Sequence, residues 1–238
     1  MQAICGPVRT ARDATAPPAA VRVVVEELVR MARTRHLAPP EVGLQHVVVV
    51  GGTGPGWEVF SDDAWRHRVR SFATALAELG VPWLTIRPVA HRLAPADETR
   101  FTTRLAGVLN GEVTGSGAVC RPVIGGPNGG VTVLVSPHAD GQERFASAVD
   151  GLRQGGVSPD DIDESALAAT LLAPCGVEPD LVVVLGPPTK LPPSLVWELA
   201  YAELVFLDLA WDVLDAGHLQ LAVDDFRRRD RRFGGVDS

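Results

Sequence analysis

Cysteine is scarce in this chain, which has only Cys5, Cys120 and Cys175, far apart in the sequence. No CxxC pair and no cluster of cysteine with histidine occurs, so neither a disulfide framework nor a structural zinc site is predicted. Three reduced thiols are typical of a cytosolic protein. We therefore expect a cytoplasmic location.

Long apolar runs are also missing. The longest one, around Val47–Val50, is far shorter than the roughly 20 residues that a membrane-spanning helix needs. The first twenty residues carry Arg9, Arg12 and Asp13 and contain no apolar segment of the length found in a secretion signal. We expect at most peripheral contact with a membrane.

Positive charge is in deficit, because the 238 residues carry a formal net charge of −7. An acidic surface repels polyanions, so nucleic acid is not an expected partner. Hydrophobic residues make up 46% of the chain and charged residues 21%, which is the ordinary composition of a globular protein. The length suits one domain, and we expect a flexible tail at 1–20 followed by a domain at 21–238.

Short β-branched runs alternate with helical patterns. His46–Val50 is a continuous apolar run of the kind found in strands buried on both faces. A helical pattern over Asp62–Leu79 follows, Gly80 closes it, and Trp83–Ile86 forms a second strand. This order predicts a βαβ unit with parallel strands and a right-handed crossover.

The same alternation continues to the end of the chain. It predicts a single α/β domain whose central, mostly parallel sheet of about six strands is flanked by helices. The further elements expected are strands at 118–124, 131–135 and 181–185, and helices at 20–36, 97–109, 143–153, 158–172, 194–205 and 219–229.

The most specific motifs lie late in the chain. A strand over 179–183 leads to Trp-Glu-Leu-Ala-Tyr-Ala-Glu at 197–203, and the chain closes with Arg-Arg-Phe-Gly-Gly at 231–235. In order and spacing these segments resemble the cis-prenyltransferases, the undecaprenyl diphosphate synthase family. The first strand followed by Trp57 also has that family's spacing, so the resemblance runs from about His46 to Gly235.

This resemblance implies a parallel sheet flanked by helices and assembly as a dimer. It also implies condensation of isopentenyl diphosphate with an allylic diphosphate, using Mg²⁺. Such chemistry needs cations and backbone N–H groups around the phosphates, carboxylates for the magnesium ion, and an apolar tunnel for the growing chain.

The family's catalytic loop has changed in this chain. The family reads Asp-Gly-Asn-Gly-Arg-Trp after the first strand, whereas residues 52–57 here read Gly-Thr-Gly-Pro-Gly-Trp. Gly52 stands at the aspartate position and Gly56 at the arginine position. A glycine has no side chain to bind Mg²⁺, so the comparison gives no certain catalytic residue and argues against a bound magnesium ion.

Three other family motifs have changed as well, at 89–94, 138–142 and 184–190. The last of them corresponds to the motif that grips isopentenyl diphosphate, and Lys190 is its one remaining cation. We therefore include Lys190 among the expected substrate-binding residues.

The glycine loop has two interpretations. Backbone N–H groups near a helix start bind phosphate in many proteins, which makes Gly51, Gly52, Gly54, Gly56 and Trp57 candidates for substrate binding. The loop lacks the spacing of a P-loop or a dinucleotide motif, so a plain turn is the other interpretation.

Two features match parts that act across the family's dimer interface. Glu203 matches the carboxylate that completes the partner's magnesium site; otherwise it is an exposed helix residue kept for packing. Arg231, Arg232 and Gly234 match an arm that reaches the partner's diphosphate; otherwise they form a solvated basic tail. The full set of expected interface residues is Glu203, Trp211, Arg232, Phe233, Gly234 and Gly235.

The remaining candidates have structural interpretations. The four tryptophans at 57, 83, 197 and 211 suit a core or an interface. His46 begins a buried strand and suits a hydrogen-bonded structural role. His91 and His138 are candidates for replacement ligands, although their spacing does not indicate a metal site.

Three functional hypotheses follow. The favoured one is a catalytically impaired subunit, in a homodimer or heterodimer, that supports an active cis-prenyltransferase through its C-terminal Arg-Phe-Gly. The second is a divergent enzyme acting on prenyl diphosphates, with Arg87, Arg92, Lys190 and the glycine loop as a rebuilt site and helices near 97–109 and 145–152 lining a pocket. The third is a protein-binding scaffold without a lipid, which an open apolar cavity would disfavour.

Overall fold

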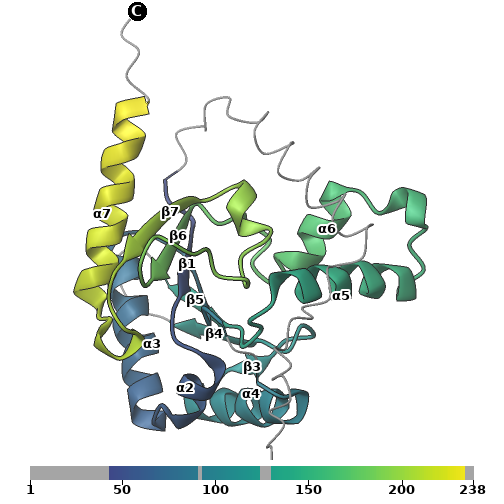
Figure 1. The fold of residues 1–238 in the computed structure, drawn as a ribbon, viewed down its shortest axis with the longest axis horizontal. Helices are drawn as coiled ribbons and strands as arrows, with labels where there is room; N and C mark the ends of the chain where they lie inside the picture. Colours follow the sequence, from purple (N-terminus) through teal and green to yellow (C-terminus); the bar gives the residue numbers. More distant parts are fainter. Residues whose placement is uncertain (1–42, 91–92, 124–129, 234–238) are drawn as a thin grey trace, which may run out of the picture.

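A computed structural model describes residues 43–90, 93–123 and 130–233 of the chain, and Figure 1 shows its fold. Seven strands form one sheet within these residues. The strands are β1 (His46–Val50), β2 (Trp83–Arg87), β3 (Glu112–Val113), β4 (Val119–Val123), β5 (Val131–Val135), β6 (Leu181–Leu185) and β7 (Glu203–Leu207).

The sheet has the order β3-β4-β5-β2-β1-β6-β7. β5, β2, β1, β6 and β7 run parallel, whereas β4 is antiparallel to both β3 and β5. The predicted βαβ unit is confirmed, because β1 pairs with β2 in parallel and a helix connects them. The sheet is therefore mostly parallel, with an antiparallel hairpin at one edge.

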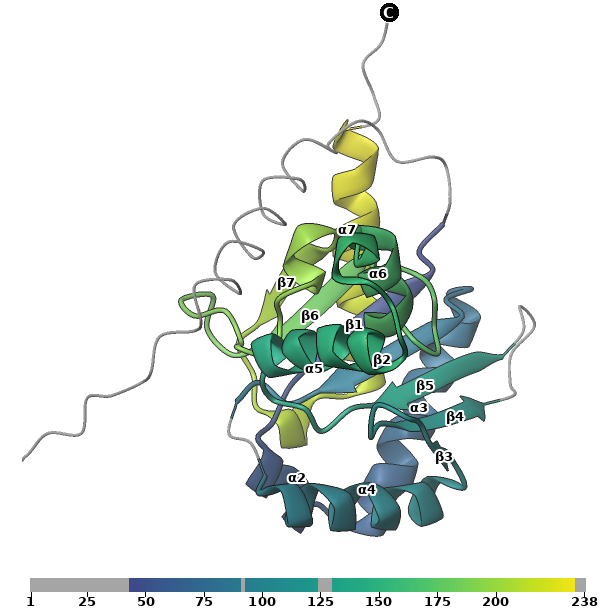
Figure 2. The ribbon, with the colours of Figure 1, turned by 90° about the vertical axis from the view of Figure 1, so that its right-hand side faces the viewer.

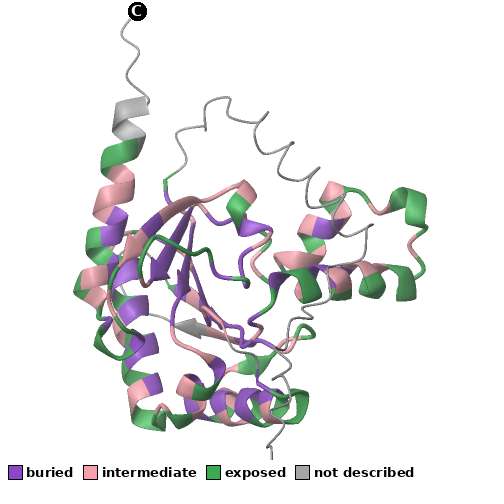
Figure 3. Ribbon diagram, in the orientation of Figure 1, coloured by how far each residue is buried: buried purple, intermediate pink, exposed green. Residues whose placement is uncertain are grey.

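The central strands are apolar because both of their faces are covered. Every residue of β1 and β6 is buried, as expected for parallel strands in the middle of an α/β sheet. Figure 3 shows this buried centre between helices whose outer faces are exposed.

The helices lie on both sides of the sheet (Figures 1 and 2). α3 and α7 contact each other and the sheet on one side, α4 packs against α3, and α5 and α6 pair on the other side. The helices are α2 (Gly54–Val59), α3 (Asp62–Glu78), α4 (Pro95–Leu109), α5 (Gly141–Gln154), α6 (Glu164–Leu171) and α7 (Ala216–Phe233). Single 3₁₀ turns are η1 (Pro159–Asp161), η2 (Glu198–Ala200) and η3 (Trp211–Val213).

The crossover helix α3 shows how local sequence fixes these boundaries. The Ser61 side chain accepts a hydrogen bond from the Ala64 N–H and caps the helix start. Gly80 follows the helix end with φ of +75°, a conformation that a glycine adopts at little cost. Trp65 and Phe72 point from α3 into the main core. The helix predicted over 62–79 is confirmed.

One predicted helix is wrong. The segment 194–205 contains only the short turn η2, and β7 begins at Glu203. Leu204, Val205 and Phe206 pair in register with Val182, Val183 and Val184 of β6. Apolar residues of high strand propensity thus extend the sheet. Their pairing with β6 outweighs the helical spacing of apolar residues on which the predicted helix rested.

Two boundaries also differ from those predicted. Ser158 forms no side-chain cap, and the helix α6 begins after Asp163, whose carboxylate accepts from the Ala166 N–H. The last helix begins at Ala216 rather than at residue 219. The tail predicted at 1–20 and the helix predicted at 20–36 lie outside the described residues.

Two further observations concern the cysteines and the length of the helices. Cys120 and Cys175, the cysteines that the structure describes, are both free. No helix in the described part of the chain combines the length and the apolar character needed to cross a bilayer.

Candidate functional site

The glycine loop leaves β1 at the carboxyl ends of the parallel strands and leads into the short helix α2. The Gly51 N–H donates to the Arg87 carbonyl oxygen at 2.9 Å, and the Gly56 N–H donates to the Thr53 hydroxyl at 3.2 Å. These two amide groups are therefore used within the chain. They are not free to bind a phosphate as predicted, although Gly52 and Gly54 remain candidates.

Trp57 closes the space beside this loop. Its side chain is fully buried, and its Nε1–H donates to the Gly51 carbonyl oxygen at 2.9 Å. A Cβ on Gly52 would lie 2.5 Å from the same Nε1, and Gly52 has a φ of +73°. Position 52 therefore has neither the backbone conformation nor the room for an ordinary side chain. The Trp57 ring has no exposed surface in this structure, so a contact between Trp57 and a substrate stays a prediction that would require this loop to open.

Trp211 packs beside Trp57 in an aromatic cluster. The ring centroids of Trp57 and Trp211 are 5.7 Å apart, and those of Trp57 and Trp65 are 5.2 Å apart. The Arg68 guanidinium lies 4.4 Å from the Trp211 ring centroid and donates to the carbonyl oxygens of Trp211 and Asp212. Trp211 is thus a core residue of its own chain. Its predicted role at a dimer interface would require its side chain to leave this cluster.

A cavity of about 680 Å³ lies on the α5 side of the sheet. This is within the range of small-molecule sites, roughly 300–1,000 Å³. Figure 2 views the molecule from this side, with α5 in front of the sheet. The lining residues come from β2, the β3–β4 turn, β5, α5 and the end of α6, and include Arg87, Ser136, His138, Arg144, Ala148 and Leu171.

Two arginines of this cavity share one buried carboxylate. Arg87 Nη1 lies 2.6 Å from Glu198 Oε1, and Arg144 Nη2 lies 2.8 Å from the same oxygen and 3.0 Å from Glu198 Oε2. The side chains of Arg87, Arg144 and Glu198 are 8%, 12% and 3% exposed. This Arg87–Glu198–Arg144 triad joins the end of β2, the turn η2 and the first turn of α5.

His138 lies at the same cavity. Its Nδ1 is 2.6 Å from Glu98 Oε1 on α4, and its Nε2 is 2.5 Å from the Ser116 carbonyl oxygen. These contacts tie α4 and the β3–β4 turn to the loop after β5. His138 thus has a structural role, and no metal-binding cluster surrounds it within the part of the chain that the structure describes.

The described residues do not fit a resident magnesium ion. Within 43–90, 93–123 and 130–233, no three His, Cys, Asp or Glu residues lie close enough together to hold a metal. Gly52 offers no carboxylate at the loop where the resemblance predicts one.

Comparisons with known proteins agree with the sequence resemblance. The family model described as "Putative undecaprenyl diphosphate synthase" matches residues 128–234. A ditrans,polycis-undecaprenyl-diphosphate synthase of Xanthomonas campestris pv. campestris is 32% identical over 186 residues, which cover 74% of this chain and 68% of that protein. The chain belongs to the cis-prenyltransferase family.

Other matches are partial in length or in sequence. The chain spans about half of the corresponding synthase of Xanthomonas axonopodis pv. citri, with 32% identity over 58% of this chain and 52% of that protein. The crystal structure of lavandulyl diphosphate synthase from Lavandula x intermedia, in complex with dimethylallyl diphosphate, has the same fold with a TM-score of 0.53. The identity is 16%, over 79% of this chain and 97% of that one. The fold of the cis-prenyltransferase family is thereby confirmed.

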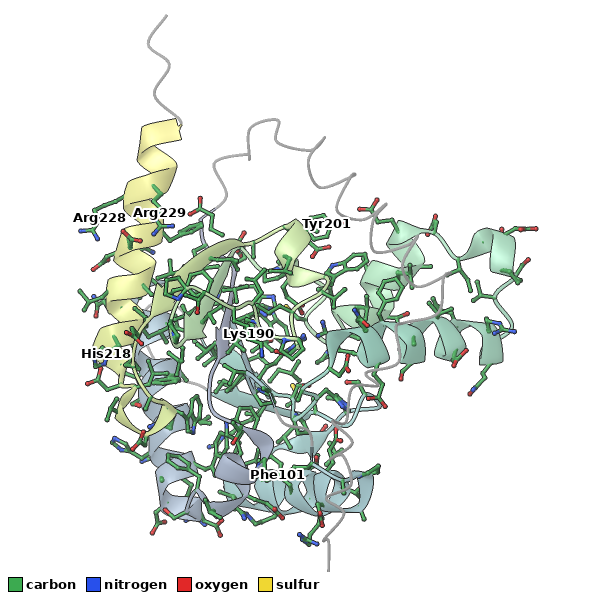
Figure 4. The ribbon with its side chains drawn as sticks, in the orientation of Figure 1. Phe101, Lys190, Tyr201, His218, Arg228 and Arg229 are labelled. Atoms are coloured by element: carbon green, nitrogen blue, oxygen red, sulfur yellow. The ribbon has the colours of Figure 1, made fainter. Side chains whose placement is uncertain are left out.

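Glu203 and the end of α7 lie together, away from the glycine loop. Glu203 is paired with Leu181 at the start of β6, and Arg229 near the end of α7 donates to the Leu204 carbonyl oxygen at 3.4 Å. Figure 4 shows Arg228 and Arg229 in the upper half of α7, with Tyr201 at the same level and Phe101 near the bottom of the molecule. Glu203 begins a strand, so its description as a helix residue is wrong.

The end of the sheet where the parallel strands begin, and where Glu203 lies, is separated from the glycine loop by the length of a strand. The loop follows the end of β1, whereas Glu203 stands level with the strand starts. Five residues of parallel strand span about 16 Å. Within one chain of this cis-prenyltransferase fold, Glu203 does not reach the loop beside Gly52.

The other predicted residues are placed as follows. Lys190 is exposed in the segment after β6 and is not among the residues lining the cavity. The backbone of Arg231, Arg232 and Phe233 continues α7, and their side chains are not described. Gly234, Gly235, His91 and Arg92 lie outside the described residues.

Sequence reasoning missed Glu198 and Arg144. Glu198 is an acidic residue inside the apolar segment 195–202, and Arg87 ends an otherwise apolar strand. Charges in such positions signal a buried pair, because an isolated buried charge is strongly disfavoured. The pattern alone does not say which arginine meets which carboxylate.

Proposed function

We propose that this chain is a subunit in isoprenoid diphosphate metabolism that does not elongate prenyl chains itself and supports an active cis-prenyltransferase. The observation that carries this proposal is the closed space beside Gly52, where Trp57 occupies the room that a metal-binding side chain would need. Without that side chain, the chain has no residue at this loop to organise a magnesium diphosphate.

The positions of Glu203 and of the end of α7 support the proposed role towards an active partner. Both lie where the strand β7 begins, so both can face a neighbouring chain at once. The arm 231–235 continues from this end of α7. A partner with an intact catalytic loop would then receive the Arg-Phe-Gly arm at its own diphosphate site.

Chain elongation by the paired subunits tests this proposal. A complete cis-prenyltransferase from the same genome is assayed with Mg²⁺, an allylic diphosphate and isopentenyl diphosphate, alone and with this chain. We expect the full chain to co-purify with the enzyme and to raise its turnover. A chain ending at residue 230 should bind more weakly and raise turnover less.

A matched control removes charge at a site away from the arm. Arg153→Gln changes an exposed arginine of α5 that pairs with Asp150 on the same helix, and it should behave as the unchanged chain. Equal stimulation by the full chain and by the shortened chain would refute the role of the arm. Absence of any complex would refute the subunit proposal.

The cavity favours a second candidate, a divergent enzyme that acts on prenyl diphosphates. The observation behind this candidate is the open cavity with Arg87 and Arg144 in its wall. Residues of α5 line the cavity, whereas no residue of the other expected lining helix, 97–109, does so. An open cavity disfavours the third hypothesis, a protein-binding scaffold without a lipid. This candidate is weaker, since neither Lys190 nor the glycine loop lines the cavity. A calorimetric titration with farnesyl diphosphate and Mg²⁺ that shows no binding would remove it.

A further inference from the structure

Among the described residues, the buried charges in the wall of the cavity do not balance. Arg87 and Arg144 carry two positive charges, and Glu198 supplies one negative charge to both. Within this part of the chain, one positive charge remains uncompensated in a largely buried environment. Such an excess is costly unless an anion or water compensates it.

Three guanidinium nitrogens of the same triad also lack acceptors among the described residues. Arg87 Nε, Arg144 Nε and Arg144 Nη1 are buried and have no hydrogen-bond partner among the described residues. Leaving a buried donor unpaired costs about 1–3 kcal/mol, and more for a charged group. Both arginines therefore have hydrogen-bonding capacity beyond what Glu198 uses.

The other acidic residues at the cavity do not cancel this excess. Asp140 and Glu143 are exposed, so water screens their charges. Asp140 Oδ1 also accepts from the N–H groups of Gln142 and Glu143 at the start of α5. Glu98 is held by His138. The unbalanced charge thus belongs to the triad.

Away from the triad, the cavity is lined largely by small and apolar side chains. Ala118 and Leu134 come from the β4–β5 side, Ala148 from α5, and Leu171 and Pro174 from the end of α6 and the residues after it. An apolar body of a ligand would lose contact with water there, at a gain of roughly 25 cal/mol per Å². The cavity therefore joins a cationic wall to an apolar space.

We infer that this cavity binds an apolar molecule with one carboxylate head group. The carboxylate lies against Arg87 and Arg144 and supplies the single negative charge that the triad lacks, while the apolar body lies along Leu134, Ala148 and Leu171. Arginine forks bind carboxylates in this way, with charge-assisted hydrogen bonds. A diphosphate carries more than the single negative charge that the triad lacks, so it matches this site less well than a carboxylate does.

The inference does not depend on whether the chain elongates prenyl groups. It is tested by calorimetric titration of the full chain with decanoate, decanol, decylamine and decyl phosphate, each below its aggregation concentration. Decanoate should bind at least tenfold more tightly than decanol, and decylamine should bind more weakly than either. Equal affinities for decanoate and decanol, or no binding of decanoate, would overturn the inference. Tighter binding of decyl phosphate than of decanoate would overturn the choice of a carboxylate.

Variants locate the binding. Arg144→Met leaves the neutral Arg87–Glu198 pair, so it should weaken decanoate binding about tenfold or more and leave decanol binding unchanged. Arg153→Met removes an exposed arginine from the same helix and should change neither affinity. Ala148→Phe fills the cavity and should weaken the binding of both ligands. Unchanged decanoate binding in Arg144→Met or in Ala148→Phe would contradict a site at this cavity.

Discussion

The indole Nε1 of Trp57 lies 2.5 Å from the position that a Cβ on Gly52 would occupy, and it is fixed there by its hydrogen bond to the Gly51 carbonyl oxygen. The loop and the aromatic cluster are therefore fitted to a glycine. Restoring a carboxylate at this position is not a single-residue change, because the tryptophan and the backbone would both have to move.

Gly52→Asp should destabilise the chain for this reason. The positive φ strains any L side chain and the contact with Trp57 adds overpacking, so we expect a loss of about 2–5 kcal/mol in the free energy of unfolding. Urea denaturation followed by circular dichroism measures it. The variant should also fail to gain Mg²⁺-dependent elongation.

Gly107→Asp is the matched control for that substitution. Gly107 lies on α4, where a Cβ would meet nothing within 4 Å and no positive φ is required. Its unfolding free energy should change by less than about 1 kcal/mol. Equal losses in the two variants would contradict the close packing at Gly52.

The Arg87–Glu198–Arg144 triad predicts an unequal response to charge removal. Glu198→Gln leaves two largely buried arginines without a counter-charge and should lower the free energy of unfolding by about 3–5 kcal/mol. Arg144→Met keeps one balanced pair and should cost less. Denaturant titrations of both variants compare them, and a smaller loss for Glu198→Gln than for Arg144→Met would contradict this assignment of charges.

His46 predicts a pH dependence of stability. It is buried, with Nδ1 2.9 Å from the Val177 carbonyl oxygen and Nε2 2.9 Å from the Thr85 hydroxyl. Burial lowers the pKa of His46 below its ordinary value of 6.5, and the Val177 carbonyl offsets part of this effect. The unfolded chain thus takes up a proton at higher pH than the folded chain, so stability falls as the pH drops below 6.5 towards the folded pKa.

The substitution His46→Gln isolates this contribution. The decrease in unfolding free energy between pH 7.5 and pH 5.5 should be smaller in the variant than in the unchanged chain. His67→Gln alters an exposed histidine on α3 and should leave the decrease as it is. An identical pH dependence in all three proteins would show that His46 is not responsible.

Cys175 predicts slow reaction with alkylating agents. Burial raises the pKa of its thiol to about 11 from an ordinary value of 9.0, and the thiolate is the reactive form. The rate of modification by iodoacetamide, followed by mass spectrometry of the Cys175 peptide, should still rise between pH 9 and pH 10.5. A rate that levels off near pH 9 would contradict the raised pKa of Cys175.

Most of the fold was predictable from the sequence because its strands are buried on both faces. The runs at 46–50 and 181–185 consist almost entirely of Val and Leu, so neither has a polar face that could meet water. Their positions match β1 and β6. The segment 194–205 was not predictable in this way. Its spacing suits a helix, and only pairing with β6 makes Glu203–Leu207 a strand.

The candidate site was predictable only in part. The loss of a carboxylate at Gly52 is visible in the sequence, whereas the closure of that space by Trp57 depends on packing. The cavity unites residues from β2, β5 and α5 that lie far apart in the chain, and the triad needs η2 to bring Glu198 between two arginines. Contacts between residues so far apart in the sequence follow from the order of the strands in the sheet and not from any local motif.

Chain elongation by the solitary protein tests the central claim most directly. The purified full chain is incubated with Mg²⁺, farnesyl diphosphate and labelled isopentenyl diphosphate, and the products are separated by length. The account predicts no elongated product above that of a reaction without protein. Robust elongation by the protein alone would contradict it.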